Sequence, residues 1–226
     1  MMRTSLKYDL NHLGMFETFV HGPIQDDEAL FLFSLCKMIR PKTIVEFGMF
    51  TGMSTWNFAK AKDDSCFLYG FDLNENAVKR ATDRCCGIKN CFFKWLDYTK
   101  FSKDHIDKRN IDLVFLDCSH DFEKNKICLN SFLPLMTDNA ILAIHDTGFY
   151  HRDIIKSLPS SHRKKYPRFA QRFASGELSP VVKDEQLTVD WIKTSFPEWS
   201  HINLFSIDHF RHGITILQKS TLFHTI

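Results

Sequence analysis

Long hydrophobic runs and an excess of charge of one sign are both missing from this sequence. The longest apolar run, ALFLF at 29–33, is far too short to span a bilayer, and the polar N-terminal segment lacks the continuous apolar stretch of a signal peptide. Basic residues outnumber acidic residues only by 29 to 27, so no overall field attracts nucleic acid or a membrane surface. We therefore expect no membrane span, whereas a local basic patch that binds nucleic acid stays open although we do not expect a nucleic-acid partner.

Cysteine spacings typical of a zinc site are also absent. The seven cysteines form no CxxC pair and no cysteine–histidine pattern of that kind. A chain of 226 residues buries enough apolar surface to fold without disulfides. These features predict one domain over residues 1–226 in a reducing, cytoplasmic environment, and they leave a homodimer open.

What the sequence does contain is a regular alternation of short apolar runs and amphipathic segments. The expected strands are 43–47, 66–72, 91–95, 112–116 and 140–144, and the expected helices are 25–39, one after Thr51, one opening at Asn74, and 123–133. Residues 1–40 form an N-terminal helical segment. Strands that alternate with helices in this way predict an α/β fold with a parallel sheet and helices on both faces.

The C-terminal part departs from this alternation. The runs 202–207 and 213–219 are separated only by DHFRH, which suits an antiparallel hairpin and cannot hold a crossover helix. The whole pattern predicts a Rossmann-like, seven-stranded, mostly parallel sheet with a C-terminal antiparallel hairpin. Residues 148–200 show no strand pattern and contain one helix around 187–196, and we expect them to form a lid or substrate insert.

The loop after the first expected strand has the features of a ligand-binding turn. Gly48 and Gly52 would let the backbone approach a ligand, and the next helix would point its N-terminus at an anion. Asp72 ends the second strand, where an acidic residue can bind ribose hydroxyls. Because any α/β fold needs tight turns and caps, a purely structural role stays open. The spacing GMFTG differs from GxGxxG and disfavours a nicotinamide-dependent oxidoreductase.

Three stretches together resemble a known family. VEFGMFTGMST, YGFDLN and DLVFLDCSHDFEKNKICLNSFLPLM…AILAIHDTG, followed by the hairpin, are similar to class I S-adenosylmethionine-dependent methyltransferases. The macrocin and antibiotic-sugar O-methyltransferases are the subgroup that the sequence resembles most, with a more distant similarity to catechol and caffeoyl-CoA O-methyltransferases. The resemblance covers roughly residues 25–147 and 201–219 and implies S-adenosylmethionine as the cofactor.

This resemblance implies a set of binding residues. The cofactor-binding residues would be Glu46, Gly48, Gly52, Ser54, Asp72, Asp97, Tyr98 and Asp117. The glycine loop would hold the methionine moiety, with Ser54 facing its carboxylate. Asp72 would bind the ribose, and Asp97 and Tyr98 would lie beside the adenine.

Asp117 and Asp146 follow two strands that should be neighbours in the sheet, so their carboxylates should repel unless a cation or a proton lies between them. Related O-methyltransferases use this location for Mg²⁺, which would assist the reaction here. Asp117 and His120 are the expected catalytic residues, and His120 occupies the place of the general base. Asp117 could instead cap the following helix. Where catechol-type enzymes have asparagine this chain has Thr147, a poorer ligand.

Two nearby residues leave alternatives open: His145 could be a core histidine that faces away from the site, and either His145 or Asp121 could serve as a further ligand.

The expected reaction is methylation of a hydroxyl on a small-molecule acceptor such as a sugar, polyol or phenol. Methyltransferases of nucleobase amines usually carry Asp/Asn-Pro-Pro-aromatic where this chain has Asp117-Cys-Ser-His120, which argues against that substrate. The basic cluster HRKKYPR at 162–168 could still meet a nucleic acid or a phosphate, although such runs are more often solvated surface. A non-catalytic nucleoside-binding module is the remaining alternative.

Overall fold

The computed structural model describes residues 8–15, 24–148, 180–204 and 213–219. Its strands are β1 (Thr43–Phe47), β2 (Phe67–Asp72), β3 (Cys91–Trp95), β4 (Ile111–Leu116), β5 (Met136–His145), β6 (Ser200–Leu204) and β7 (Ile214–Gln218). Its α-helices are α1 (Asp26–Ile39), α2 (Met53–Ala61), α3 (Glu75–Arg84), α4 (Phe122–Phe132) and α8 (Pro180–Ser195). Short 3₁₀ helices are η1 (Asn11–Met15), η2 (Tyr98–Lys100), η3 (Lys103–Ile106) and η4 (Leu133–Leu135).

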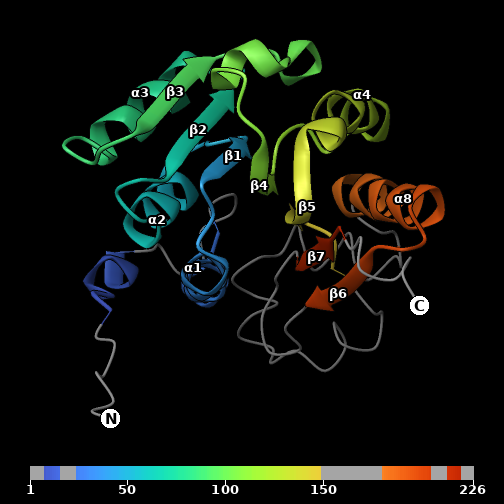
Figure 1. Ribbon diagram of the computed structural model, residues 1–226, viewed down its shortest axis with the longest axis horizontal. Helices are drawn as coiled ribbons and strands as arrows, with labels where there is room; N and C mark the ends of the chain where they lie inside the picture. The colour runs from blue at the N-terminus through green and yellow to red at the C-terminus, as the bar shows by residue number, and fades with distance from the viewer. Residues whose placement is uncertain (1–7, 16–23, 149–179, 205–212, 220–226) are drawn as a thin grey trace, which may run out of the picture.

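All seven strands form one sheet in the order β3-β2-β1-β4-β5-β7-β6 (Figure 1). Strands β1 to β5 pair in parallel, while β7 pairs antiparallel with both β5 and β6. The predicted fold class is therefore confirmed, including the C-terminal hairpin. Because parallel strands end at the same edge, the loops after β1, β2 and β4 come together there.

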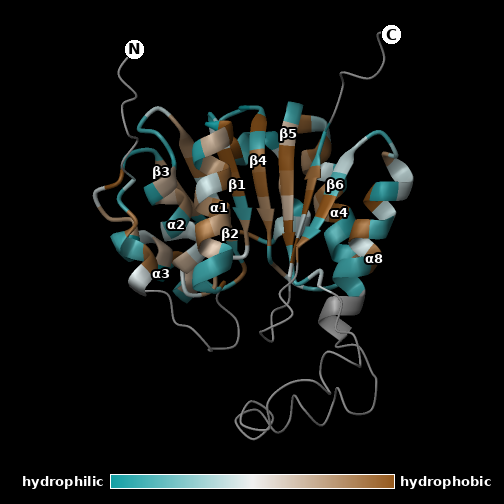
Figure 2. Cartoon of the chain, turned by 90° about the horizontal axis from the view of Figure 1, so that it is seen from below, coloured by the Kyte–Doolittle hydropathy of each residue, from teal (hydrophilic) through white to brown (hydrophobic). Residues whose placement is uncertain are grey.

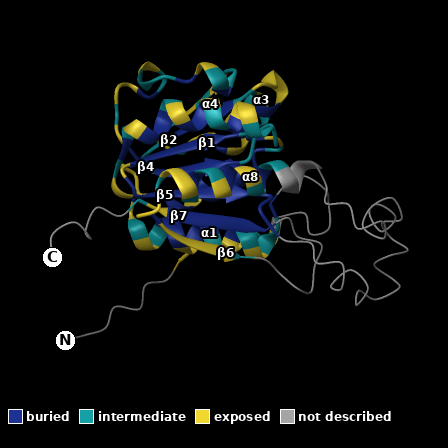
Figure 3. Cartoon of the chain, turned by 90° about the vertical axis from the view of Figure 1, so that its right-hand side faces the viewer, coloured by how far each residue is buried: buried dark blue, intermediate teal, exposed yellow. Residues whose placement is uncertain are grey.

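Alternate residues of each strand face two separate hydrophobic layers, as the pleat of a β-strand requires. In β4, Val114 and Leu116 belong to the layer covered by α4 and α8, whereas Leu113 and Phe115 belong to the layer covered by α1 and α2. Figure 2 shows the apolar central strands between the helices, and Figure 3 shows the helices with exposed outer faces around the buried central strands, whereas the edge strand β6 is exposed. Helices therefore cover both faces, as predicted.

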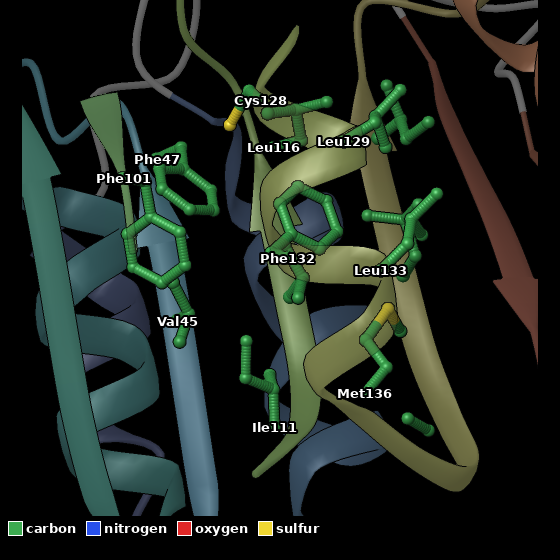
Figure 4. Packing of buried hydrophobic residues seen from close by; sticks show 14 of the residues in the cluster. Val45, Phe47, Phe101, Ile111, Leu116, Cys128, Leu129, Phe132, Leu133 and Met136 are labelled. Atoms are coloured by element: carbon green, nitrogen blue, oxygen red, sulfur yellow. The ribbon is translucent and has the colours of Figure 1, made fainter. Parts of the chain in front are cut away.

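Aromatic packing joins the sheet to α4 (Figure 4). Phe47 of β1 stacks on Phe132 of α4 with ring centroids 5.4 Å apart, and it meets Phe101 edge-on at 5.0 Å. All three side chains are buried. This contact holds the end of β1, and with it the start of the glycine loop, against the helix that follows β4.

Helix α8 begins at Pro180, earlier than the helix expected around 187–196. It packs against α4 and β5, and its side chains Val189 and Ile192 are buried in the core. This part of the expected insert therefore belongs to the folded core. The rest of the insert, including the basic cluster at 162–168, lies outside the described residues.

Among the described residues, no helix has both the length and the apolar character needed to cross a bilayer.

Candidate active site

The glycines after β1 permit close backbone contacts that other residues would block. Gly48 has φ +90°, and a Cβ there would overlap the backbone carbonyl of Asp117 after β4. Gly52 has φ +76° and is the N-cap of α2, where a Cβ would lie 2.9 Å from the backbone of Ala81 in α3. Both positions therefore need glycine for conformation and for space. Gly52, rather than a side chain of Thr51, Ser54 or Thr55, begins this helix.

Asp72, at the end of β2, holds the glycine loop in place. Its Oδ2 accepts hydrogen bonds from the backbone amides of Met49 at 2.7 Å and Phe50 at 3.0 Å. Its Oδ1 accepts one from the amide of Asn74 at 2.8 Å. Each carboxylate oxygen can accept more than one hydrogen bond, so Asp72 can order this loop and still bind a ligand hydroxyl.

A pocket of about 210 Å³ opens beside these loops at the carboxyl edge of the sheet. It is lined by Gly48, Phe50, Phe71, Asp72, Leu73, Asn74, Ala77, Tyr98, Asp117, Cys118 and Ser119. Four of the residues expected to bind the cofactor, Gly48, Asp72, Tyr98 and Asp117, therefore line one pocket, although each lies at or after the end of a different strand.

The other four expected cofactor residues do not line this pocket. Glu46 is fully buried, and its Oε1 accepts a hydrogen bond from the hydroxyl of Ser54. Burial raises the pKa of Glu46 to about 8. Gly52 acts at the start of α2, and Asp97 accepts a hydrogen bond from the amide of Thr99 at 3.0 Å. Direct contacts of these residues with a cofactor stay predictions.

Beside the pocket, Asp117, His120 and Asp146 form a compact cluster. One potential ligand atom from each of the three lies within 4.8 Å of the others. His120 Nε2 is 3.3 Å from Asp146 Oδ2 and 4.0 Å from Asp117 Oδ1. Strands β4 and β5 are parallel neighbours, which explains why the residues that follow them meet. The structure thus brings together the three residues expected to hold a metal and carry out catalysis.

His145, the last residue of β5, is buried beside the Asp117–His120–Asp146 cluster, which we call the acidic cluster. Its Nδ1 lies 3.4 Å from Asp117 Oδ1 and 3.3 Å from Asp146 Oδ1, and its Nε2 lies 3.3 Å from Glu28 Oε2 of α1. Burial acts to lower the pKa of His145, but the three carboxylates raise it well above its usual value. The alternative in which His145 faces away from the site is therefore wrong.

Glu185 of α8 approaches the cluster from the opposite side of His120. Its Oε1 is 3.0 Å from His120 Nδ1. Burial acts to lower the pKa of His120, but the Glu185 hydrogen bond and the charges of Asp146 and Asp117 raise it to about 9. His120 is therefore protonated at neutral pH as long as no cation neutralises the charges of these carboxylates.

Two residues of the cluster hold unusual backbone conformations. His120 has φ +50° and Asp146 has φ +60°, both in the left-handed region that residues other than glycine rarely adopt. Such strain is often found where a site requires one side-chain direction.

The helix-capping alternative for Asp117 is not what the structure shows. The N-cap of α4 is Asp121, whose Oδ1 accepts a hydrogen bond from the amide of Lys124 at 3.1 Å. Asp121 is consequently engaged at the helix end and is not part of the three-residue ligand cluster.

Sequence reasoning missed Glu28 and Glu185. Each lies in the apolar stripe of its helix: Glu185 precedes Val189 by four residues and Ile192 by seven, and Glu28 precedes Leu32 by four. A carboxylate in an apolar stripe is rarely buried without a partner, so the position of these glutamates in the sequence could have indicated a buried polar contact.

Residues 45–147 match a family model described as a methyltransferase domain. No curated protein sequence matches the chain. Among solved structures, an O-methyltransferase from Bacillus cereus in complex with S-adenosylhomocysteine is 14% identical with a TM-score of 0.64, over 89% of this chain and 84% of that one. TomG from Streptomyces achromogenes, an O-methyltransferase involved in tomaymycin synthesis and solved with S-adenosylmethionine, is 12% identical with a TM-score of 0.56, over 88% and 82%.

The S-adenosylhomocysteine-bound methyltransferase PaMTH1 from Podospora anserina is 13% identical with a TM-score of 0.59, over 93% of this chain and 86% of that one. At such identities these structures show a shared fold, whereas the family match carries the assignment over residues 45–147. Residues 45–147 therefore match a methyltransferase domain, and the described sheet and helices share the fold of methyltransferases that were solved with S-adenosylmethionine or S-adenosylhomocysteine.

Proposed function

We propose that this enzyme transfers a methyl group from S-adenosylmethionine to a hydroxyl of a small molecule such as a sugar, polyol or phenol. One observation carries the proposal: Asp117 lines the pocket beside the glycine loop and also belongs to the Asp117–His120–Asp146 cluster. A cofactor in that pocket would lie next to the cluster. The O-methyltransferase neighbours support a hydroxyl as the acceptor group.

The pocket residues fit the cofactor in chemical character. S-adenosylmethionine supplies an electrophilic methyl group bound to a sulfonium. Asp72 can bind the ribose hydroxyls, and Tyr98 and Leu73 offer surfaces for a planar base. Gly48 lines the same pocket, where its backbone could approach the methionine part.

The donor set beside the pocket fits a divalent cation. Four carboxylates, from Glu28, Asp117, Asp146 and Glu185, surround two imidazoles, so negative charge remains even when both imidazoles are protonated. Asp117 and Asp146 would hold Mg²⁺ or a similar ion, which supplies a Lewis acid that lowers the pKa of the acceptor hydroxyl.

His120 would act as the general base at Nε2. The acceptor oxygen forms a bond to the methyl carbon as the carbon–sulfur bond breaks, S-adenosylhomocysteine leaves, and His120 takes the hydroxyl proton. Because the surrounding carboxylates hold the pKa of His120 at about 9, a positive charge on Asp117 and Asp146 would be needed to lower it and free the nitrogen at neutral pH.

The test is acceptor-dependent release of S-adenosylhomocysteine, with catechol, a methyl hexopyranoside and inositol as probes, in Mg²⁺ and in EDTA. We expect release with at least one probe and a fall of about 10²- to 10⁴-fold in His120→Ala. His201→Ala, an exposed histidine on β6, is the matched control. Unchanged release in His120→Ala would rule out the base. Release with single-stranded RNA alone would instead favour the nucleic-acid alternative.

Two further expectations belong to this proposal. The segment before α8 would line the acceptor site as a lid, and its basic cluster at 162–168 would be solvated surface, with contact to an anionic acceptor as the alternative. A reducing cytoplasmic location is supported by the seven cysteines, which are all free thiols.

A further inference from the structure

The buried carboxylate of Glu185 has a nitrogen next to each of its oxygens. Its side chain is 1% exposed, with Oε1 3.0 Å from His120 Nδ1 and Oε2 3.0 Å from Asn125 Nδ2. Asn125 is also fully buried. Burying a carboxylate is unfavourable unless hydrogen-bond donors replace the lost water, so both nitrogens are expected to donate.

Neighbouring hydrogen bonds fix the direction of these contacts. The hydroxyl of Thr188 donates to the carbonyl oxygen of Asp184 at 2.8 Å, so its lone pairs accept from Asn125 Nδ2 at 3.3 Å. This turns the amide nitrogen of Asn125 toward α8, where it donates to Glu185. An ionised carboxylate only accepts hydrogen bonds, and His120 therefore has to offer a proton on Nδ1.

We infer that Glu185 is a positioning residue, which holds His120 in the form with the proton on Nδ1 and leaves Nε2 facing Asp117 and Asp146. The inference rests on the proposed function, in which Nε2 takes the proton of the acceptor hydroxyl. A histidine held by a carboxylate at one ring nitrogen and active at the other is a general arrangement in enzymes and metal sites. Here the carboxylate comes from a helix far from the glycine loop in sequence.

Glu185→Gln provides a sharp test because it changes the shape of the side chain very little. Asn125 still donates to position 185, so the glutamine oxygen should face Asn125 and its NH₂ group should face His120. Nδ1 would then have to accept, and the proton of the neutral ring would move to Nε2. The variant thus inverts the tautomer without removing a contact. Asp190→Asn, an exposed carboxylate-to-amide change on the same helix, is the matched control.

The measurement is ¹⁵N–¹H NMR of histidine-labelled full-length protein, with the pH raised until the His120 signals show a neutral ring. His120→Gln assigns the signal. We expect an Nδ1–H ring in the wild type and in Asp190→Asn, and an Nε2–H ring in Glu185→Gln. Once an acceptor is identified, kcat should fall by about 10²- to 10⁴-fold in Glu185→Gln, with KM for S-adenosylmethionine unchanged.

An Nε2–H ring in the wild type would overturn the inference, and so would an Nδ1–H ring that persists in Glu185→Gln. If Glu185→Gln fails to fold, the wild-type tautomer decides alone. Calorimetric titration of the same wild-type sample with S-adenosylmethionine separates the two proposals: absent binding would reject the proposed function, whereas the tautomer depends only on Glu185 and its neighbours.

Discussion

His145 Nε2 lies 3.3 Å from Glu28 Oε2, which connects the end of β5 to the first turn of α1. The same oxygen of Glu28 accepts a hydrogen bond from the amide of Gln25 at 2.9 Å. One carboxylate thus begins the N-terminal helix and also faces the acidic cluster through His145. The N-terminal helix is therefore attached to the candidate active site through a charged contact as well as through apolar packing.

Glu28→Gln should lower the free energy of unfolding by about 1–3 kcal/mol, because a charged hydrogen-bond partner of the buried His145 becomes neutral. The backbone contact with Gln25 can persist, since glutamine also offers an oxygen. Urea unfolding at neutral pH measures the change. Glu123→Gln, an exposed glutamate in the first turn of α4, should change stability much less. Equal effects of the two substitutions would show that the His145 contact contributes nothing.

Glu46→Gln should alter how stability depends on pH. Because the pKa of Glu46 is raised from its ordinary value of 4.5 to about 8, the folded wild type binds more protons than the unfolded chain between these values. Wild-type stability should therefore decrease as pH rises through this window, by up to about 5 kcal/mol in total. Glutamine does not titrate and should remove the contribution of Glu46, whereas the decrease that comes from the raised pKa values of His120 and His145 should remain.

Urea unfolding of the wild type and of Glu46→Gln at about pH 5 and about pH 8.5 covers most of the range between the two pKa values. Glu75→Gln, in the first turn of α3, is the control and should keep the wild-type pH dependence. A pH dependence of Glu46→Gln equal to that of the wild type would contradict the raised pKa of Glu46.

A divalent cation should stabilise the wild type through the acidic cluster. With the ion at about a hundred times its Kd, the gain is about 2.7 kcal/mol, which corresponds to a rise in Tm of about 5–10 °C in a chain of this size. Asp146→Asn should abolish the rise. Asp121→Asn should retain it, because asparagine caps a helix as well as aspartate does and position 121 lies outside the cluster. Thermal unfolding with Mg²⁺, Mn²⁺ or EDTA gives the answer, and no rise with either ion would remove the cation from the mechanism.

The sequence was sufficient to predict the strands of the sheet, because they are short runs of β-branched and aromatic residues with clear ends. The expected strand 43–47 coincides with β1, and the expected run 112–116 lies within β4. The meeting of Asp117 and Asp146 followed from strand order alone, since residues after adjacent parallel strands share one edge. Local pattern and topology determine these features.

Contacts made by packing between distant helices could not be predicted in the same way. Glu185 reaches His120 only because α8 packs on α4, and nothing local to 180–195 specifies that neighbour. Glu28 likewise depends on how α1 lies against the end of β5. Ser54 was expected to face a ligand, but its hydroxyl donates to the buried Glu46, a requirement visible only when the burial of Glu46 is known.

The proposed methyl transfer requires S-adenosylmethionine to bind in the pocket beside Asp72. Calorimetric titration with S-adenosylmethionine and S-adenosylhomocysteine should give micromolar binding to the wild type. Asp72→Ala should weaken it by about 10- to 100-fold, since a carboxylate–hydroxyl hydrogen bond contributes about 1.5–3 kcal/mol. Asp64→Ala, an exposed aspartate paired with Lys89 and remote from the pocket, should bind like the wild type. Binding of neither nucleoside to the wild type would contradict the proposed methyltransferase function.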